Sequence, residues 1–268
     1  MSGGARSQSS TSSSCADLCS VFRELAQWTW SRLEAANRCY MPFNEETITD
    51  YLLLELAARC PNRVKVIPFT KAREKEVGAD WEWWFYNRPN GIGCRVQAKL
   101  LNRKTLRYES LKFRPRGSSQ TDVLILSSSS DNLIPMFCFY GFDGRGPLPA
   151  GLFYSPLQGC SVAHASNIRA ISSKYGGVVI PHTIPWHELV CSPSGVGSSL
   201  EQIAGHIADL TRPSEYEPEL IRRLPPYVIN LILERKRGPE LDGSLGSRDK
   251  PDREFPIRGV VAIRVDEG

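Results

Sequence analysis

The chain has 268 residues, of which 41% are hydrophobic, and its 33 basic and 29 acidic side chains leave a net charge of +4. This length is enough to bury a sizeable core in one enlarged domain, or in one domain with a smaller appendage. The weak positive charge does not identify a nucleic-acid partner by itself. No apolar run reaches the roughly 18 residues of a membrane-spanning helix, which argues against a membrane protein.

The N-terminal residues 1–14 are polar and rich in serine, and they predict a disordered leader rather than a secretory signal. We therefore expect a cytoplasmic protein. Eight cysteines occur without a CxxC pair or a Cys/His set of zinc-ligand spacing. Neither a zinc site nor a disulfide is expected in a reducing compartment.

Two helices are predicted next. Residues 16–37 repeat apolar side chains at a helical period, and a second helix ends before Pro61. Asn44 is a suitable N-cap for the second helix, and the acidic residues Glu45 and Glu46 favour its positive end.

Four strands and another helix follow. Strands are expected at 63–69, 80–86 and 92–101, with a hairpin turn at Asn90-Gly91 between the last two. Residues 118–132 favour a short helix with serine caps, although their VLIL run would also suit a strand. The apolar run 134–142 is typical of a buried strand.

The C-terminal half is less regular. We predict helices at 161–173, 199–211 and 217–236, with a short strand GGVVIP between the first two. Residues 237–255 have the composition of a flexible linker, and 256–265 could form a late strand.

Polar side chains gather on the predicted hairpin. Residues two apart on a strand share a face, so Gln97 and Lys99 point the same way, and pairing brings Asp80 close to Lys99. The alternate aromatic residues Trp81, Trp83 and Phe85 are expected to pack in the core.

This set suits a hard divalent cation. Mg²⁺ prefers oxygen ligands, which the Asp80 carboxylate, the Gln97 side-chain carbonyl and the Ala98 backbone carbonyl can supply. Lys99 can hold a water or offset charge that develops on a phosphate. Phosphodiester hydrolysis is the chemistry that this combination favours.

The arrangement of Asp80 and Gln97-Ala98-Lys99 on consecutive strands, after a glutamate-bearing helix, resembles the PD-(D/E)xK nuclease superfamily in its QxK variant. The string GADWEWW…RVQAKLL also resembles an uncharacterised bacterial family assigned to that superfamily. The resemblance implies an α/β fold with a three-layer, restriction-endonuclease-like core (αβββαβ) and a central mixed sheet over residues 44–142. A nuclease-like domain would then span 15–236, with helical elaboration at 143–236 and a linker and possible terminal strand at 237–268.

The same resemblance implies an endonuclease that uses Mg²⁺, or Mn²⁺ in its place, to cut DNA, with a role in restriction or phage defence. Asp80 matches the metal-binding aspartate, Gln97 the second ligand and Lys99 the catalytic lysine. Glu46 is our choice for the additional helix carboxylate, with Glu45 and Glu55 as rivals.

Two departures from the superfamily pattern leave alternatives open. Ala79 replaces the namesake proline, and the neutral Gln97 should bind a metal more weakly than glutamate, unless Glu46, Glu82 or Glu74 compensates. An inactive nucleic-acid-binding or protein-interaction module on the same fold is therefore one alternative. A solvated strand face and an interaction protein that uses the C-terminal half are others. A homodimer or a partner subunit would be compatible with each.

A basic segment follows the proposed site. Eight basic residues and one acid, Glu109, lie between Arg95 and Arg116, a cluster that could neutralise phosphates or simply form a solvated loop. The expected nucleic-acid contacts are Arg103, Lys104, Arg107, Lys112 and Arg114. The four histidines share no spacing, and each is expected to be structural or superficial: His164, His182, His187 and His206.

Overall fold

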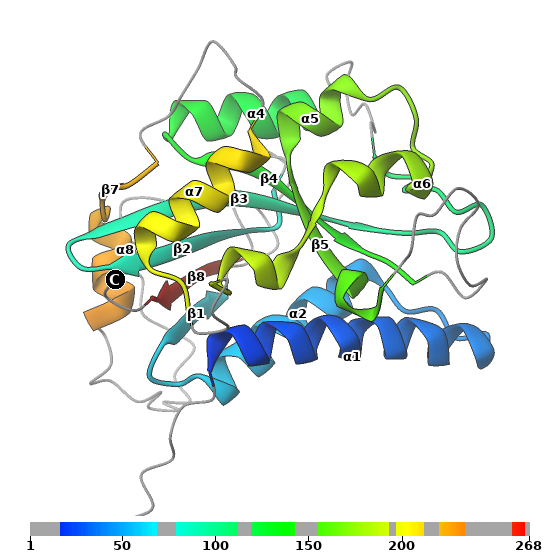
Figure 1. Cartoon of the computed structure of the whole chain (residues 1–268), viewed down its shortest axis with the longest axis horizontal. Coiled ribbons are helices and arrows are strands. Elements are labelled where there is room, and N and C mark those ends of the chain that lie inside the picture. The colour runs from blue at the N-terminus through cyan, green and yellow to red at the C-terminus, as the bar shows by residue number, and fades with distance from the viewer. Residues whose placement is uncertain are drawn as a thin grey trace, which may run out of the picture.

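The computed structural model describes residues 17–68, 79–111, 119–142, 155–192, 197–211, 220–233 and 259–265. Within these ranges the chain has an α/β fold with a mixed eight-stranded sheet and seven α-helices (Figure 1). The predicted leader and the predicted linker at 237–255 lie outside the described residues. No helix in the described part of the chain combines the length and apolar composition needed to cross a bilayer.

Both N-terminal helices are confirmed. Helix α1 (Leu18–Arg38) begins after Asp17, whose side chain accepts a hydrogen bond from the amide of Ser20 at 3.1 Å. Helix α2 (Glu45–Arg59) begins after Asn44, although the Asn44 side chain makes no capping bond in the described structure. The acidic first turn of α2 complements the positive end of the helix dipole.

The four strands predicted in the N-terminal half all join one sheet, as β1 (Val64–Pro68), β2 (Trp81–Asn87), β3 (Asn90–Leu100) and β4 (Ile134–Tyr140). Between β3 and β4 lies α4 (Gln120–Ser130), so the helical interpretation of this segment is confirmed. The hairpin turn was placed wrongly. It lies at Arg88-Pro89, because Asn90 and Gly91 continue β3 and pair with the two-residue strand β7 (Arg222–Arg223).

The late strand is confirmed as β8 (Gly259–Arg264), and it lies inside the sheet. The strand order is β1-β8-β2-β3-β4-β5-β6, where β5 is Cys160–His164 and β6 is Ile184–Pro185. Strand β8 runs antiparallel to β1 and parallel to β2. It therefore joins the edge strand β1 to the β2–β3 hairpin.

The C-terminal half differs from its prediction in three places. The helix expected at 161–173 is strand β5 followed by α5 (Ala165–Ala170), because residues 160–164 pair with β4 and His164 caps the helix. The expected GGVVIP strand is α6 (Gly176–Val179) followed by the 3-10 helix η3 (Ile180–His182). Within the described residues 220–233, the helix expected at 217–236 is replaced by strand β7 followed by α8 (Pro226–Leu233), with proline at its first position.

The remaining elements are α7 (Leu200–Leu210), which confirms its prediction, and the 3-10 helices η2 (Pro156–Gly159) and η4 (Trp186–Leu189). Helix α7 begins with a capping box, in which Ser199 and Gln202 bond to each other's backbone amides.

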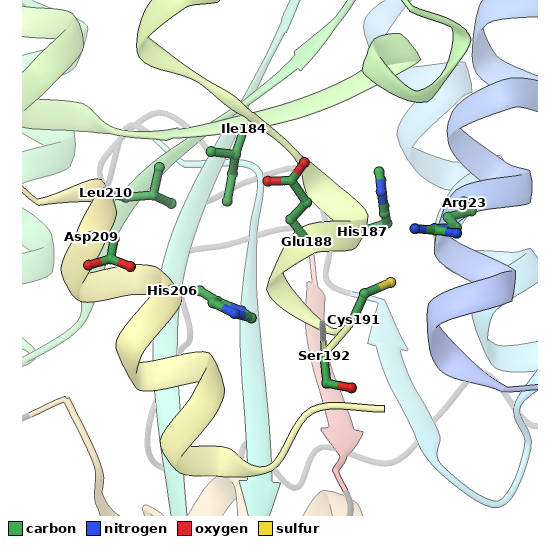
Figure 2. A pocket seen from close by; sticks show the side chains of 9 residues that line it. All are labelled: Arg23, Ile184, His187, Glu188, Cys191, Ser192, His206, Asp209 and Leu210. Atoms are coloured by element: carbon green, nitrogen blue, oxygen red, sulfur yellow. The ribbon is translucent and has the colours of Figure 1, made fainter. Parts of the chain in front are cut away.

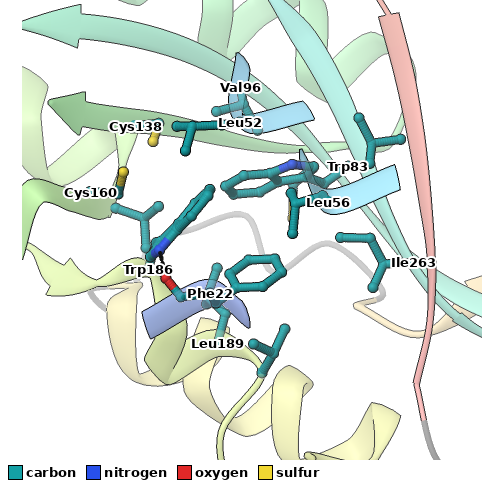
Figure 3. Packing of buried hydrophobic residues seen from close by; sticks show 14 of the residues in the cluster. Phe22, Leu52, Leu56, Trp83, Val96, Cys138, Cys160, Trp186, Leu189 and Ile263 are labelled. Carbon is teal, nitrogen blue, oxygen red and sulfur yellow. Dashed lines mark hydrogen bonds between the residues drawn. The ribbon is translucent and has the colours of Figure 1, made fainter. Parts of the chain in front are cut away.

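Helices cover both faces of the sheet. One hydrophobic cluster packs α1, α2, η4 and α7 against Trp83 and other residues of one face, and Figure 3 shows its centre. There the indole N–H of Trp186 donates to the backbone oxygen of Phe22 at 2.7 Å. The second cluster packs α4, α5 and α8 against the opposite face, where Trp84 and Phe139 lie. As predicted, Trp81, Trp83 and Phe85 are core residues.

The expectation that disulfides are absent is wrong. Cys19 at the start of α1 and Cys191 after η4 form a disulfide, with their Cα atoms 4.9 Å apart. The two residues are separated by 172 positions in sequence. Only the packing of η4 against α1 brings them together, and no spacing rule could have paired them.

Candidate active site

The candidate site lies where β3 extends past the beginning of β2. Trp81 is the first residue of β2 and pairs with Val96, so the end of β3 has no β2 neighbour. Asp80 fills this place at the bend before β2. Its amide donates to the Val96 oxygen at 2.8 Å, and its Oδ2 accepts from the Ala98 amide at 2.7 Å. The Asp80 carboxylate is therefore held by the strand backbone.

Helix α2 supplies a second carboxylate to the same strand edge. Glu45 Oε2 accepts a hydrogen bond from the amide of Leu100 at 2.8 Å. The backbone groups of alternate strand residues point to the same side, so the Ala98 carbonyl faces this edge between the two bonded amides. Two carboxylates and one peptide oxygen therefore converge at the end of β3.

These groups open into a cavity of about 350 Å³, which we call the acidic cavity. The structure brings the four predicted side chains Asp80, Gln97, Lys99 and Glu46 together around it, and Glu45 joins them. Helix α2, the β2–β3 hairpin, the segment after β3 and the start of α4 contribute the lining, which is Glu45, Glu46, Thr49, Asp80, Gln97, Lys99, Ser110 and Gln120.

Lys99 is 3% exposed and lies near two carboxylates, those of Glu45 and Asp80. Burial lowers its pKa, because removing an ammonium group from water penalises the charged form. The carboxylates of Glu45 and Asp80 act in the opposite direction and favour the ammonium. Lys99 is thus a desolvated amine whose pKa is lowered by burial and supported by two nearby carboxylates.

Gln97 supplies an oxygen whose bonding is incomplete. The residue is 3% exposed, and its Oε1 finds no hydrogen-bond donor among the described residues. A buried acceptor without a donor costs about 1–3 kcal/mol, so a bound ligand at this position would recover stability. In the part of the chain that the structure describes, no three His, Cys, Asp or Glu side chains are grouped to hold a metal. A cation here would need mixed oxygen donors from Asp80, Gln97 and Ala98.

The two neighbouring glutamates of α2 differ in position. Glu45 is half-buried and bonds to β3, whereas Glu46, our sequence-based choice, lines the cavity but is exposed. The third candidate, Glu55, does not line the cavity. Adjacent helical residues point about 100° apart, and the sequence does not reveal how α2 is rotated about its axis.

The suggestion that Glu82 or Glu74 compensates for Gln97 receives no support. Glu82 is buried and ion-paired with Arg95 at 2.9 Å, and its other oxygen accepts from the Tyr227 hydroxyl at 2.8 Å. Glu74 lies outside the described residues. Glu82 therefore binds Arg95 and Tyr227 and does not line the acidic cavity.

The predicted basic cluster is divided by the fold. Arg95 is 2% exposed and pairs with Glu82 and Asp131, so including it in a phosphate-binding surface was wrong. Lys104 and Arg107 are exposed after β3, and the guanidinium of Arg103 lies 5.0 Å from the ring centre of Phe142. The other members, Lys112, Arg114 and Arg116, fall outside the described residues.

A second cavity, of about 400 Å³, lies between α1, η4 and α7 (Figure 2). We call it the histidine cavity. Figure 2 shows His187 on the side of Arg23, whereas Glu188 points toward Ile184. Sequence spacing did not indicate that two histidines line the same cavity. The described lining is Arg23, Ile184, His187, Glu188, Cys191, Ser192, His206, Asp209 and Leu210.

His187 lies in an environment that disfavours charge. Burial lowers the pKa of His187 to about 4, and the positive charge of Arg23 adds to this effect. His187 is consequently neutral near pH 7. Burial and the surrounding charges act differently on Glu188, whose pKa is raised mainly by desolvation while His206 and Arg23 oppose the rise.

The chain belongs to a family of unknown function, DUF6615, whose model matches residues 18–267. The match spans both cavities and nearly the whole chain. Comparison with curated proteins finds no match.

Proposed function

We propose that this member of DUF6615 is a divalent-metal-dependent endonuclease that hydrolyses phosphodiester bonds of DNA. The observation that carries the proposal is the acidic cavity itself. Asp80 and Glu45 accept from backbone amides two residues apart on β3, and the buried Lys99 lies near both carboxylates. A buried amine beside fixed carboxylates is an arrangement that can stabilise charge during phosphoryl chemistry.

The order of elements supports a restriction-endonuclease-like core. Helix α2, strands β1 to β3, helix α4 and strand β4 follow one another along the chain, and all four strands belong to one mixed sheet. The PD-(D/E)xK resemblance requires this helix, three-strand, helix, strand order. Strand β8 adds a neighbour between β1 and β2 without interrupting the β2–β3 hairpin that holds Asp80, Gln97 and Lys99.

The donor set of the acidic cavity fits Mg²⁺, with Mn²⁺ as a substitute. Asp80, the orphaned Gln97 Oε1 and the Ala98 carbonyl are hard oxygen donors, and they would hold the ion together with waters. When bound, such an ion supplies charge stabilisation at phosphoryl oxygens. The amide oxygen of Gln97 carries no charge, so it would bind the ion more weakly than a carboxylate.

The chain's own residues have separable tasks in this proposal. Lys99 orients the attacking water and donates a hydrogen bond to the phosphate, where negative charge accumulates in the transition state. Asp80 and Glu45 favour the ammonium form of the lysine side chain against the effect of burial. The Ala98 and Leu100 amides fix the two carboxylates, so the site is organised before the substrate arrives.

A second function rests on the neutral Gln97. With one ligand uncharged, the fold can serve as an inactive nucleic-acid-binding or protein-interaction module. A role in restriction or phage defence belongs to the nuclease proposal and depends on activity.

Incubation with supercoiled plasmid, linear duplex and RNA, each with Mg²⁺, Mn²⁺ or EDTA, tests the proposal. We expect nicking or linearisation of DNA that requires the metal and disappears with Lys99→Ala. Metal-dependent cleavage that Lys99→Ala retains would place the activity elsewhere. Absence of cleavage under every condition, with DNA still bound, would favour the inactive module.

A further inference from the structure

We infer that a groove beside the acidic cavity binds an unpaired DNA base that flanks the phosphate to be cut. This inference rests on the proposed function and specifies its substrate as DNA with a single-stranded segment at the site. The groove encloses about 710 Å³ between α1, the α1–α2 connection and the end of β3. We call it the Tyr40 groove, after its most exposed aromatic residue.

The Tyr40 groove and the acidic cavity adjoin each other at two points of the chain. Asn44 lines the groove and Glu45 the cavity, while Leu100 lines the groove and Lys99 the cavity. The hydrogen bond from the Leu100 amide to Glu45 joins these two points. A strand whose phosphate enters the acidic cavity would therefore extend its next nucleotide into the groove.

Tyr40 occupies a backbone position that normally favours glycine. Helix α1 ends with the Met41 amide bonded to the Ala36 oxygen at 2.9 Å and the Tyr40 amide bonded to the Asn37 oxygen at 3.1 Å. This is a Schellman-type end, and Tyr40 has the left-handed φ of 55°. Its side chain is 96% exposed, so the ring adds little to the packing of the fold while the backbone conformation disfavours tyrosine.

The charge of the groove suits a nucleic-acid strand. Its described lining contains two basic residues, Arg103 and Lys104, and no acidic residue. The guanidinium of Arg103 packs over Phe142 at 5.0 Å, which holds the cation at the groove wall. The carboxylates of Glu45, Glu46 and Asp80 line the adjoining acidic cavity instead. The groove thus attracts phosphates at the side where the cavity would hold a cation.

An exposed tyrosine next to cations is a stacking platform for single strands. Aromatic rings bind the faces of bases irrespective of sequence, and basic residues follow the backbone. In a duplex these faces are already covered by neighbouring bases. Tyr40, which is followed by Met41 with 66% exposure, is therefore suited to an unpaired base.

The test measures binding of the full chain to short DNA strands in EDTA, where metal-dependent cleavage cannot occur. One strand carries the fluorescent base 2-aminopurine in a single-stranded segment, and a blunt duplex of equal length serves for comparison. We expect Tyr40→Gly to weaken single-strand binding about 10-fold and to abolish quenching of 2-aminopurine, whereas Tyr40→Trp retains both.

Stability separates this effect from damage to the fold. Glycine suits the left-handed position, so Tyr40→Gly should raise the melting temperature by about 2–4 °C while binding falls. Leu126→Ala is the matched control, because Leu126 is 70% exposed on α4 and does not line the groove. Its single-strand affinity should equal that of the wild type.

Three results would overturn the inference: unchanged single-strand affinity in Tyr40→Gly, equal or tighter binding of the blunt duplex, or a Tyr40-dependent preference for RNA of the same sequence. Because binding is measured without metal, a protein that never cuts can still confirm the groove. If the protein cuts DNA but substitution of Tyr40 leaves single-strand binding unchanged, only the inference about the groove is contradicted, and the proposed nuclease activity stands.

Discussion

The acidic cavity and the histidine cavity have similar volumes, about 350 and 400 Å³, and both collect ionisable side chains from distant parts of the chain. They differ in how these side chains are held. In the acidic cavity, Asp80 accepts a hydrogen bond from the Ala98 amide of β3, and Glu45 accepts one from the Leu100 amide. The charges of both carboxylates oppose the effect of burial on the pKa of Lys99. In the histidine cavity, burial keeps His187 uncharged.

A cluster of titratable groups therefore does not by itself indicate catalysis. A buried lysine beside two backbone-bound carboxylates and the orphaned acceptor of Gln97 forms a polar, desolvated site that can stabilise charge in a reaction. The buried, neutral imidazole of His187 contributes mainly a dependence of stability on pH. Four experiments test this contrast between the two cavities.

The largest effect is expected on cleavage. Asp80→Ala and Lys99→Ala should each reduce metal-dependent DNA cleavage by at least two decades, about 2.7 kcal/mol, because each removes a charge from the acidic cavity. His206→Ala, in the histidine cavity, should cut at the wild-type rate. Initial rates on plasmid, with circular dichroism to confirm folding, provide the measurement. Equal losses in all three variants would remove the distinction between the cavities.

The histidine cavity should govern stability in acid. The pKa of His187 is lowered from 6.5 to about 4 in the folded protein, so between these values the unfolded chain binds more protons. Stability should therefore fall as the pH drops from 6.5 to 4, by about 2 kcal/mol for this residue. His164, whose pKa burial also lowers to about 4, adds to the loss.

Urea unfolding at pH 7 and pH 4.5 checks this expectation. His187→Gln should lose less stability between the two pH values than the wild type, because it removes one group that must be uncharged in the fold. An identical pH dependence in the two proteins would mean that His187 is readily protonated in the folded state.

A smaller effect should distinguish the two neighbouring glutamates of α2. Glu45→Gln should reduce cleavage about 10-fold, or 1.4 kcal/mol, because it removes an anion that supports the charge of Lys99. Glu46→Gln is its matched control, being one residue away and exposed, and it should lose less. A greater loss in Glu46→Gln would restore the sequence-based choice of helix carboxylate.

The smallest effect is expected from a substitution that adds charge. Gln97→Glu should tighten Mg²⁺ binding about 5-fold if this position is a ligand, since a carboxylate binds the ion better than an amide. Calorimetric titration gives the affinity, and activity at low Mg²⁺ should be retained or increased. An unchanged affinity would exclude Gln97 from the ligand set.

The sequence predicted the strands of the hairpin well, because alternation is a local signal, although the turn between them was placed too late in the chain. Trp81, Trp83 and Phe85 identified one buried face, and the two-residue spacing of Gln97 and Lys99 identified the other. The convergence of Asp80 on the same edge followed from pairing alone. Glu45 was left unresolved beside Glu46, because the rotation of α2 depends on its tertiary packing.

The secondary structure of the C-terminal half was predicted less well, because its elements are short and depend on contacts with residues distant in sequence. Residues 160–164 form a strand because they pair with β4. Cys191 reaches Cys19 because η4 packs on α1. Arg95 illustrates the same limit within the hairpin. Its charge suggested a phosphate contact, yet Glu82 and Asp131 hold it in an ion pair.

Strand β8 has a consequence for how the chain acquires its structure. It lies between β1 and β2, although more than half of the sequence separates it from both. Until β8 arrives, one edge of β1 and one edge of β2 lack this partner, and such open edges invite pairing with other chains. Contacts between such distant segments also slow folding. We therefore expect the sheet to close late, with the risk of aggregation concentrated in the interval before β8 is inserted.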